Sequence, residues 1–374
     1  MSEHQCYEFL AVDRPLSAKQ MAELRAISSR AEISPTRFWN EYHWGDLRAD
    51  AMKLMARYFD AHLYFANWGT RRLMLRVPKA RLDAKALRAY IGDGNAFGLK
   101  SSGDHVVLEF VSDDEEPHYD DDIAQGALTS LVPLRAELMS SDLRPAYLAW
   151  LLRLQSGELD DDDTEPPVPA GLGRLTAAQD AMVDFLRIDP DLLQVAAGGS
   201  AEAERDDVRF RHWVAHLPQK QKDAWLDRAA NDPELALGAE LLRTFRASQP
   251  PAATAGRRTV GELEALAEAR RAEREKAAAG RAKRTAAAAE RKRQQHLSKL
   301  AGELDRAWAR LETLVASSEY DEAVQLAIDL RDLAQRDGNA TEFADRFQQL
   351  RKRQERRRGF FDRWKRTERS ATSR

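Results

Sequence analysis

Residues 267–296 read AEARRAEREKAAAGRAKRTAAAAERKRQQH, and this stretch decides how the rest of the chain is organised. It contains no Leu, Ile, Val, Met, Phe, Tyr or Trp, and it consists mostly of Ala, Arg, Lys, Glu and Gln, which favour helices. A segment without large apolar side chains cannot build a core. It can still be helical through alanine propensity, extended from helical ends on both sides. We therefore expect a basic, Ala/Arg-rich helical arm over residues 257–296 that is exposed to solvent.

Apolar residues return beyond the arm at spacings of three and four, which is typical of the seam of a coiled coil or helical bundle. Breaks at Ser317-Ser318 and at Asp337-Gly338-Asn339 divide this part into three helical segments. The pattern predicts a three-helix bundle over residues 297–350. The seam residues are Leu297, Leu300, Leu304, Ala307, Leu311 and Leu314.

Before the arm, the first residues alternate between strand and helix patterns. Leu63-Tyr64-Phe65 and Leu73-Met74-Leu75 are strand-like, and the segment Asn67-Trp68-Gly69-Thr70 between them is typical of a tight turn. We expect an α+β domain over residues 1–112, arranged as a split β-α-β sandwich.

Helical patterns dominate between this domain and the arm. Residues 113–247 combine acidic linkers, one of them at residues 158–169, with apolar helical segments. Residues 248–256, rich in proline and alanine, form a further linker, and residues 351–374 form a basic tail with aromatic residues. The expected fold class is an α+β N-terminal domain followed by a mostly α part with a long basic helix and a small C-terminal helical bundle.

The 374-residue chain has a net charge of −3 that conceals a division between its two ends. Residues 257–374 contain 29 Lys and Arg and 20 Asp and Glu, a net charge of +9, which leaves −12 for residues 1–256. Such asymmetry favours a basic end that meets an anionic partner, or two halves that meet each other. The single cysteine, Cys6, excludes an intramolecular disulfide framework and favours a reducing compartment. We find no transmembrane segment and no signal peptide, and we expect a cytoplasmic protein.

Candidate catalytic and metal-binding residues are few. His212 and His216 lie four apart on an expected helix, but the glutamate of a zinc-protease motif is absent and no third ligand is identified. The acidic runs at residues 113–122 and 158–165 lack the ligand alternation of a calcium loop and are typical of solvated linkers. Cys6 lacks an oriented base. We therefore expect no metal site and no cofactor, and we assign no catalytic residue.

The tip of the predicted hairpin is a candidate partner-binding surface, formed by Trp68, Arg71 and Arg72. A tryptophan beside two arginines can stack on a base, a sugar or a side chain of a protein partner. The alternative is that Trp68 folds back over the sheet.

The C-terminal tail is a candidate nucleic-acid-binding segment, because basic side chains neutralise phosphates and interleaved aromatic rings stack on bases. Two alternatives are that the tail holds the chain to an anionic membrane, and that the aromatic rings dock on the bundle while the arginines are solvated. The candidate residues are Arg351, Lys352, Arg353, Arg356, Arg357, Arg358, Phe360, Phe361 and Trp364.

Three parts of the chain resemble an uncharacterised family of bacterial proteins. They are Tyr7-Glu8-Phe9 with Asp13-Arg14-Pro15-Leu16, the hairpin Ala66-Asn67-Trp68-Gly69-Thr70-Arg71, and Glu319-Tyr320-Asp321-Glu322-Ala323-Val324 with Leu330-Arg331-Asp332-Leu333-Ala334. Because these parts lie near both ends, the resemblance covers most of the chain. It implies a bacterial protein with a fixed domain order, and it carries over no activity and no catalytic residues.

These observations favour a non-enzymatic interaction or scaffold protein, with an acidic head that binds a protein partner and a basic helical arm. Two alternatives stay open. One is a nucleic-acid-binding accessory protein that uses the basic arm and tail. The other is a metal-dependent hydrolase in residues 1–245 that uses acidic residues of the head.

Overall fold

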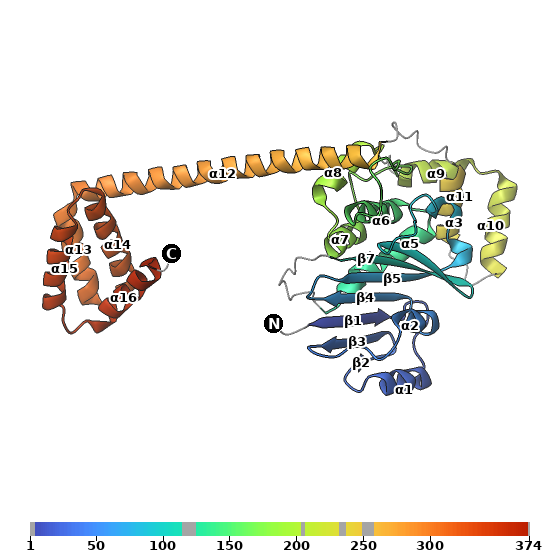
Figure 1. Ribbon diagram of the computed structural model, residues 1–374, viewed down its shortest axis with the longest axis horizontal. Helices are drawn as coiled ribbons and strands as arrows, with labels where there is room; N and C mark the ends of the chain where they lie inside the picture. Colours follow the sequence, from blue (N-terminus) through green and yellow to red (C-terminus); the bar gives the residue numbers. More distant parts are fainter. Residues whose placement is uncertain (1–3, 114–124, 203–205, 232–236, 249–257, 373–374) are drawn as a thin grey trace. The chain divides into compact units, whose positions relative to one another are not determined.

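The computed structural model describes residues 4–113, 125–202, 206–231, 237–248 and 258–372, and the chain divides into two compact units (Figure 1). We call Met1–Ala272 the N-terminal unit and Glu273–Arg374 the C-terminal unit. Helix α12 (Val260–Gly302) begins in the first unit and ends in the second. Among the described residues, no helix combines the length and the apolar character needed to cross a membrane.

A sheet of seven strands organises the described part of the N-terminal unit, and each neighbouring pair of strands is antiparallel. The order across the sheet is β2-β3-β1-β4-β5-β7-β6. The expected split β-α-β arrangement is present once: β3 and β4, joined through the helix Ala51–Arg57, both pair antiparallel with β1 and so run parallel to each other with β1 between them. The strands are β1 (Gln5–Leu10), β2 (Glu32–Ile33), β3 (Arg37–Tyr42), β4 (Ala61–Ala66), β5 (Arg71–Pro78), β6 (Phe97–Ser102) and β7 (His105–Ser112).

The predicted hairpin is confirmed and joins β4 to β5. The amide of Ala66 donates to the carbonyl of Thr70 over 2.9 Å, which closes the turn. Gly69 has a φ of +117°, a conformation that residues with a Cβ avoid, and this explains the glycine in the turn. Asn67 also fixes the start of β1, since its amide donates to the carbonyl of His4 and its side-chain oxygen accepts from the His4 amide.

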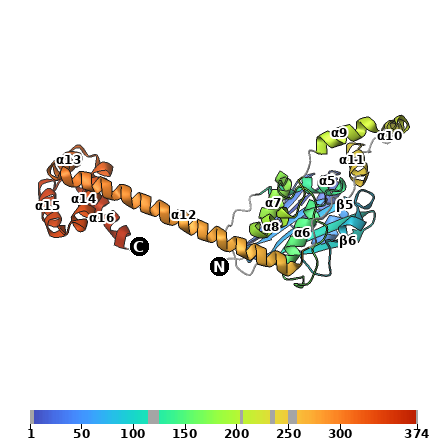
Figure 2. The same ribbon diagram turned by 90° about the horizontal axis from the view of Figure 1, so that it is seen from above.

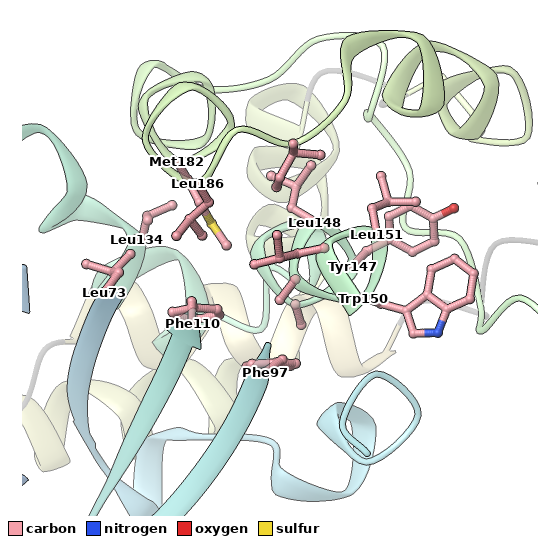
Figure 3. Close-up of a cluster of buried hydrophobic side chains, with 14 of the residues drawn as sticks. Leu73, Phe97, Phe110, Leu134, Tyr147, Leu148, Trp150, Leu151, Met182 and Leu186 are labelled. Carbon is pink, nitrogen blue, oxygen red and sulfur yellow. The ribbon is translucent and has the colours of Figure 1, made fainter. Parts of the chain in front are cut away.

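Helices cover both faces of this sheet. On one face, α1 (Ala18–Ile27) and α2 (Ala51–Arg57) contribute Leu24 and Met55 to a core around Phe9 and Phe38. On the other face, ten consecutive residues of α6, residues 145–154, are buried, because this almost entirely apolar helix packs between the sheet and α7 (Figure 3). The helices of this second face are α4 (Ala127–Leu131), α5 (Pro133–Met139), α6 (Arg144–Gln155), α7 (Ala177–Leu186) and α8 (Pro190–Gly198).

The other helices of the N-terminal unit are shorter or more exposed. Phe245 is buried between Phe210 and Trp213, with ring centroids 5.6 and 5.7 Å away, and this contact joins α11 to α9. These helices are η1 (Lys79–Arg81), α3 (Ala84–Leu87), α9 (Asp206–His216), α10 (Gln219–Asn231) and α11 (Leu237–Ser248).

A buried ion pair ties the start of α12 to the N-terminal unit. Glu165 is 2% exposed, and its carboxylate accepts hydrogen bonds from Arg258 Nε at 2.9 Å and from Arg258 Nη2 at 2.7 Å. Tyr147 also donates its hydroxyl to Glu165. The expectation that residues 158–169 form an exposed linker is therefore wrong at Glu165, because its partner comes from 93 positions further along the chain.

Four helices that follow α12 form the bundle of the C-terminal unit (Figure 2). Their apolar faces meet in a core that includes Leu311, Leu330 and Leu350 and, from α16, Phe360 and Trp364. The aromatic residues beyond position 350 thus belong to a helix of the bundle. The predicted fold class is confirmed. The helices are α13 (Leu304–Ser317), α14 (Tyr320–Arg336), α15 (Ala340–Arg353) and α16 (Arg358–Thr372).

One buried histidine makes the stability of the N-terminal unit depend on pH. Burial lowers the pKa of His62 to about 3, and its ring stacks on Phe9 with centroids 3.9 Å apart. An unfolded histidine takes up a proton near pH 6.5, whereas folded His62 does not until about pH 3. The contribution of His62 to stability is therefore present above pH 6.5 and falls as the pH drops from there towards 3.

We expect wild-type protein to lose about 2 kcal/mol more than the variant His62→Asn between pH 7 and pH 5. Asparagine keeps a donor for the carbonyl of Glu8, which lies 2.9 Å from His62 Nδ1, and it does not titrate. The measurement is urea unfolding at both pH values. If both proteins lost the same free energy of unfolding between pH 7 and pH 5, the pKa of His62 in the folded protein would not be lowered.

Candidate functional site

The hairpin tip brings Trp68 to the surface, with 43% of the residue exposed. Arg71 is turned towards the helices, where Nη1 donates to the carbonyl of Phe185 over 2.9 Å. Arg72 pairs with Glu109 of the neighbouring strand β7 at 3.3 Å. The two arginines therefore hold the hairpin to its surroundings, and partner binding at this tip stays a prediction that depends on Trp68.

Three side chains suited to metal binding gather at the end of the sheet where β1 begins and β3 ends. Nε2 of His4 lies 2.6 Å from Oε1 of Glu41, and Nε2 of His43 lies 3.6 Å from the same oxygen. The rings of His4 and His43 stack with their centroids 5.3 Å apart. Within the part of the chain that the structure describes, no other group of three His, Cys, Asp or Glu has its ligand atoms within 4.8 Å of one another. We call it the His4–Glu41–His43 cluster.

Strand alternation and register explain the cluster. Glu41 and His43 are two residues apart, so they face the same side of the sheet. Cys6 pairs with Glu41 across the two strands, and His4, two residues before Cys6, faces that side as well. This group was not predicted from the sequence. The pattern Glu41-x-His43 was a visible signal, but His4 joins it only through the pairing of β1 with β3.

Hydrogen bonds also fix the loop that follows His43. Gln5 donates from Nε2 to the carbonyl of Gly45 over 2.5 Å. The hydroxyl of Tyr7 donates to Oδ1 of Asp46 over 2.5 Å. Both donors lie on β1, the strand that follows His4. The loop after His43 is therefore attached to the strand that begins beside His4, and this keeps the two histidines close to each other.

Cys6 is buried, and its surroundings keep the thiol protonated. Burial, with the nearby carboxylates of Glu8 and Glu41, raises the pKa of the Cys6 thiol to about 12. A thiol with so high a pKa holds little thiolate at neutral pH. Cys6 therefore packs inside the fold as a protonated thiol.

The histidine pair considered from the sequence does come together on α9. The rings of His212 and His216 stack with centroids 4.0 Å apart, and both side chains are exposed. Nδ1 of His216 lies 2.7 Å from the carbonyl of His212. No third His, Cys, Asp or Glu among the described residues completes a metal site with this pair.

The basic residues of the candidate nucleic-acid segment lie at the junction of α15 and α16, and all but the half-buried Arg357 are exposed. Arg353 pairs with Glu312 at 2.8 Å. Phe360 is fully buried and Trp364 is 6% exposed, so in the folded bundle these two rings are not available to stack on bases. The structure therefore keeps the basic residues together and separates them from two of the three aromatic candidates.

A groove with aromatic walls crosses the surface of the bundle between α14, α15 and α16, and we call it the aromatic groove. The guanidinium of Arg331 lies 5.6 Å from the ring centroid of Trp364, and that of Arg351 lies 5.8 Å from the ring centroid of Phe361. Apolar walls with a basic rim suit an acidic, partly apolar ligand. The residues used below are Arg331, Phe343, Phe347, Arg351, Phe361 and Lys365.

Helix α12 is anchored at both ends and exposed between them. Its first turns bury three apolar side chains in the core of the N-terminal unit, those of Val260, Leu263 and Ala267. Near its other end, Arg293 pairs with Asp329 of the bundle at 2.5 Å. Every residue from 268 to 292 is exposed except Gly280, which is half-buried. The predicted long basic helix is thus confirmed, and we call residues 268–292 the connector.

Two buried carboxylates in the described part of the N-terminal unit form ion pairs with arginines. Glu8 pairs with Arg37 at 2.8 Å, and Asp60 pairs with Arg76 at 2.7 Å. Both carboxylates are at most 3% exposed. Each therefore neutralises an arginine inside the fold, which is a sufficient reason for its burial.

Comparison with known proteins adds no assignment: no family model, no curated protein and no solved structure matches this chain. Its function is therefore inferred from its own residues.

Proposed function

We propose that this chain is an interaction or scaffold protein whose two units bind separate partners and are joined by α12. The observation that carries the proposal is the exposed connector, residues 268–292. A helix that is polar on all sides gains no stability from packing, and such helices are typical of solvent-bridging connections between domains. Anchoring at both ends makes this helix a fixed part of each unit.

The aromatic groove is the binding surface that we assign to the C-terminal unit. Phe343, Phe347 and Phe361 are half-buried, so each ring still offers apolar area to a ligand. Arg351 and Lys365 at the rim are exposed and attract anionic groups. We expect an acidic amphipathic segment of a partner protein to lie in this groove, with its apolar side against the rings.

Exposed tryptophans support a second surface in the N-terminal unit. Trp44 is 69% exposed and Trp68 is 43% exposed. Strands β3 and β4 both end opposite Gln5 of β1. Trp44 comes two residues after the end of β3 and Trp68 two residues after the end of β4, so both tryptophans lie at the same end of the sheet. Tryptophan is enriched among the residues that dominate protein–protein binding energy.

The groove is tested with two full-length variants that carry the same change in charge. One is Arg351→Glu with Lys365→Glu, at the rim of the groove, and the other is Lys352→Glu with Arg356→Glu, at exposed positions outside it. Quantitative co-purification from nuclease-treated extract compares both with the wild type. We expect the rim variant to lose bound protein by at least about tenfold and the control variant to retain it.

Nucleic-acid binding predicts a different result for the same two variants in a separate binding assay. A labelled single-stranded oligonucleotide held by the basic residues would bind less tightly to both variants and would dissociate steeply with added salt. Retention of all bound proteins by the rim variant would contradict the groove proposal. Equal loss from both variants, with strong oligonucleotide binding, would replace it with the nucleic-acid alternative.

A further inference from the structure

The His4–Glu41–His43 cluster has the composition of a transition-metal site. Two imidazoles and one carboxylate are a common set of protein ligands for Zn²⁺ and related ions. The proposed interaction function does not use these residues. Their arrangement therefore calls for a separate explanation.

The distances within the cluster are close to those that a metal ion requires. Ligand atoms about 2.1 Å from a tetrahedral ion lie about 3.4 Å from one another. The separation between His43 Nε2 and Glu41 Oε1 is 3.6 Å, whereas that between His4 Nε2 and the same oxygen is 2.6 Å. An ion shared by the three groups needs the His4–Glu41 contact to open by less than one ångström.

The exposure of the three side chains permits this adjustment. The side chain of His4 is 16% exposed, that of Glu41 is 35% exposed and that of His43 is 66% exposed. His4 is fixed by Asn67, as described above, while the two more exposed ligands can turn towards an ion. The open side also leaves room for a water molecule in the fourth position.

The nitrogen of His4 that contacts Glu41 is the one available to an ion, because the other ring nitrogen is buried. Nδ1 of His4 is buried and has no hydrogen-bond partner in the described part of the chain. The contact with Glu41 is therefore the only polar bond that this ring makes in the described part of the chain. A cation replaces that single contact with bonds to all three side chains.

We propose that His4, Glu41 and His43 bind one divalent transition-metal ion, with Zn²⁺ as the ion that this donor set favours. The site lies at the end of the sheet beside Trp44 and Trp68, the surface assigned above to a partner of the N-terminal unit. Metal binding at this place does not depend on the aromatic groove or on the C-terminal unit.

The test is calorimetric titration of Zn²⁺ into tag-free, chelator-washed, full-length protein. We expect one strong site in the wild type and an affinity lower by at least about 100-fold in Glu41→Gln and in His43→Gln. Both positions are exposed enough that neither variant should unfold, and circular dichroism verifies this. Absorption spectra with Co²⁺ report whether the ion has nitrogen and oxygen ligands in tetrahedral geometry.

The histidine pair on α9 supplies the matched control. His212→Gln with His216→Gln removes two exposed imidazoles that also lie close together. We expect this double variant to keep the strong site. The proposal is overturned if the wild type shows no strong site, or if the α9 variant loses the site while Glu41→Gln keeps it.

Discussion

Replacing Arg258 with methionine is expected to destabilise the N-terminal unit by about 3–5 kcal/mol, because it leaves a buried carboxylate without its cation. The side chain of Glu165 is 1% exposed and that of Arg258 is 20% exposed. Without the guanidinium, Glu165 keeps the hydroxyl of Tyr147 as a donor and loses both charged hydrogen bonds. The bond from Arg258 Nη1 to the carbonyl of Val195, at 2.8 Å, is lost as well.

Hydrogen exchange locates the effect within the chain. Val260 donates its amide to the carbonyl of Asp163, and Glu165 donates to the carbonyl of Arg258. We expect exchange at residues 258–268 to accelerate strongly in Arg258→Met, together with a lower unfolding temperature of the N-terminal unit. The start of α12 would then be held less firmly to that unit, where Val260, Leu263 and Ala267 remain in the core.

Two further variants separate charge burial from lost packing. Arg258→Met with Glu165→Gln removes both charges and keeps an acceptor for Tyr147, so it should recover a large part of the lost stability. Arg57→Met breaks a pair with Glu23 in which the arginine is 65% exposed, and we expect it to cost less than about 1 kcal/mol. If Arg57→Met and Arg258→Met lowered the free energy of unfolding equally, burial of the Glu165–Arg258 pair would not explain its contribution to stability.

Two features of the fold, the connector and the hairpin between β4 and β5, could be predicted from short stretches of sequence. The connector could be predicted because it lies within residues 267–296, where no large apolar side chain occurs and helix propensity is the main determinant. The hairpin could be predicted because the turn at Gly69 needs a residue that accepts positive φ. Both features depend on residues that are close along the chain.

Long-range pairing was the part that sequence could not supply. Glu165 follows a run of four aspartates, and Asp160 to Asp163 are indeed exposed, so composition alone predicts a solvated linker. Only the approach of Arg258 makes burial of Glu165 favourable. The His4–Glu41–His43 cluster was missed for the same reason, since the register between β1 and β3 was unknown.

In residues 351–374, the spacing of the aromatic residues already indicated a helix that packs on the bundle. Phe360 and Trp364 are four residues apart, which places them on one face of a helix. That spacing was available in the sequence, and it favoured docking on the bundle. The basic residues 351–358 favoured nucleic acid instead, and in the structure they lie at the end of α15 and the start of α16, whereas Phe360 and Trp364 are buried in the bundle.

Replacing Phe360 with alanine is expected to destabilise the C-terminal bundle by about 3–5 kcal/mol, the usual cost of removing a fully buried phenylalanine. The ring has no exposed area, and its centroid lies 4.9 Å from that of Phe361 and 6.1 Å from that of Phe347. Helix α16 also approaches α14 closely, since a Cβ at Gly359 would come within 2.8 Å of Tyr320 Cε2. Removal of Phe360 therefore leaves a cavity in a well-packed contact.

The expected result separates a structural helix from a free nucleic-acid-binding tail. If α16 belongs to the bundle core, Phe360→Ala lowers the unfolding temperature of the C-terminal unit and accelerates hydrogen exchange in α14, while Arg356→Ala at an exposed position changes neither. If the aromatic residues instead projected into solvent to stack on bases, Phe360→Ala would leave the stability unchanged and weaken oligonucleotide binding. The half-buried Phe361 gives an intermediate case, since its replacement by alanine removes less buried area and changes one wall of the aromatic groove.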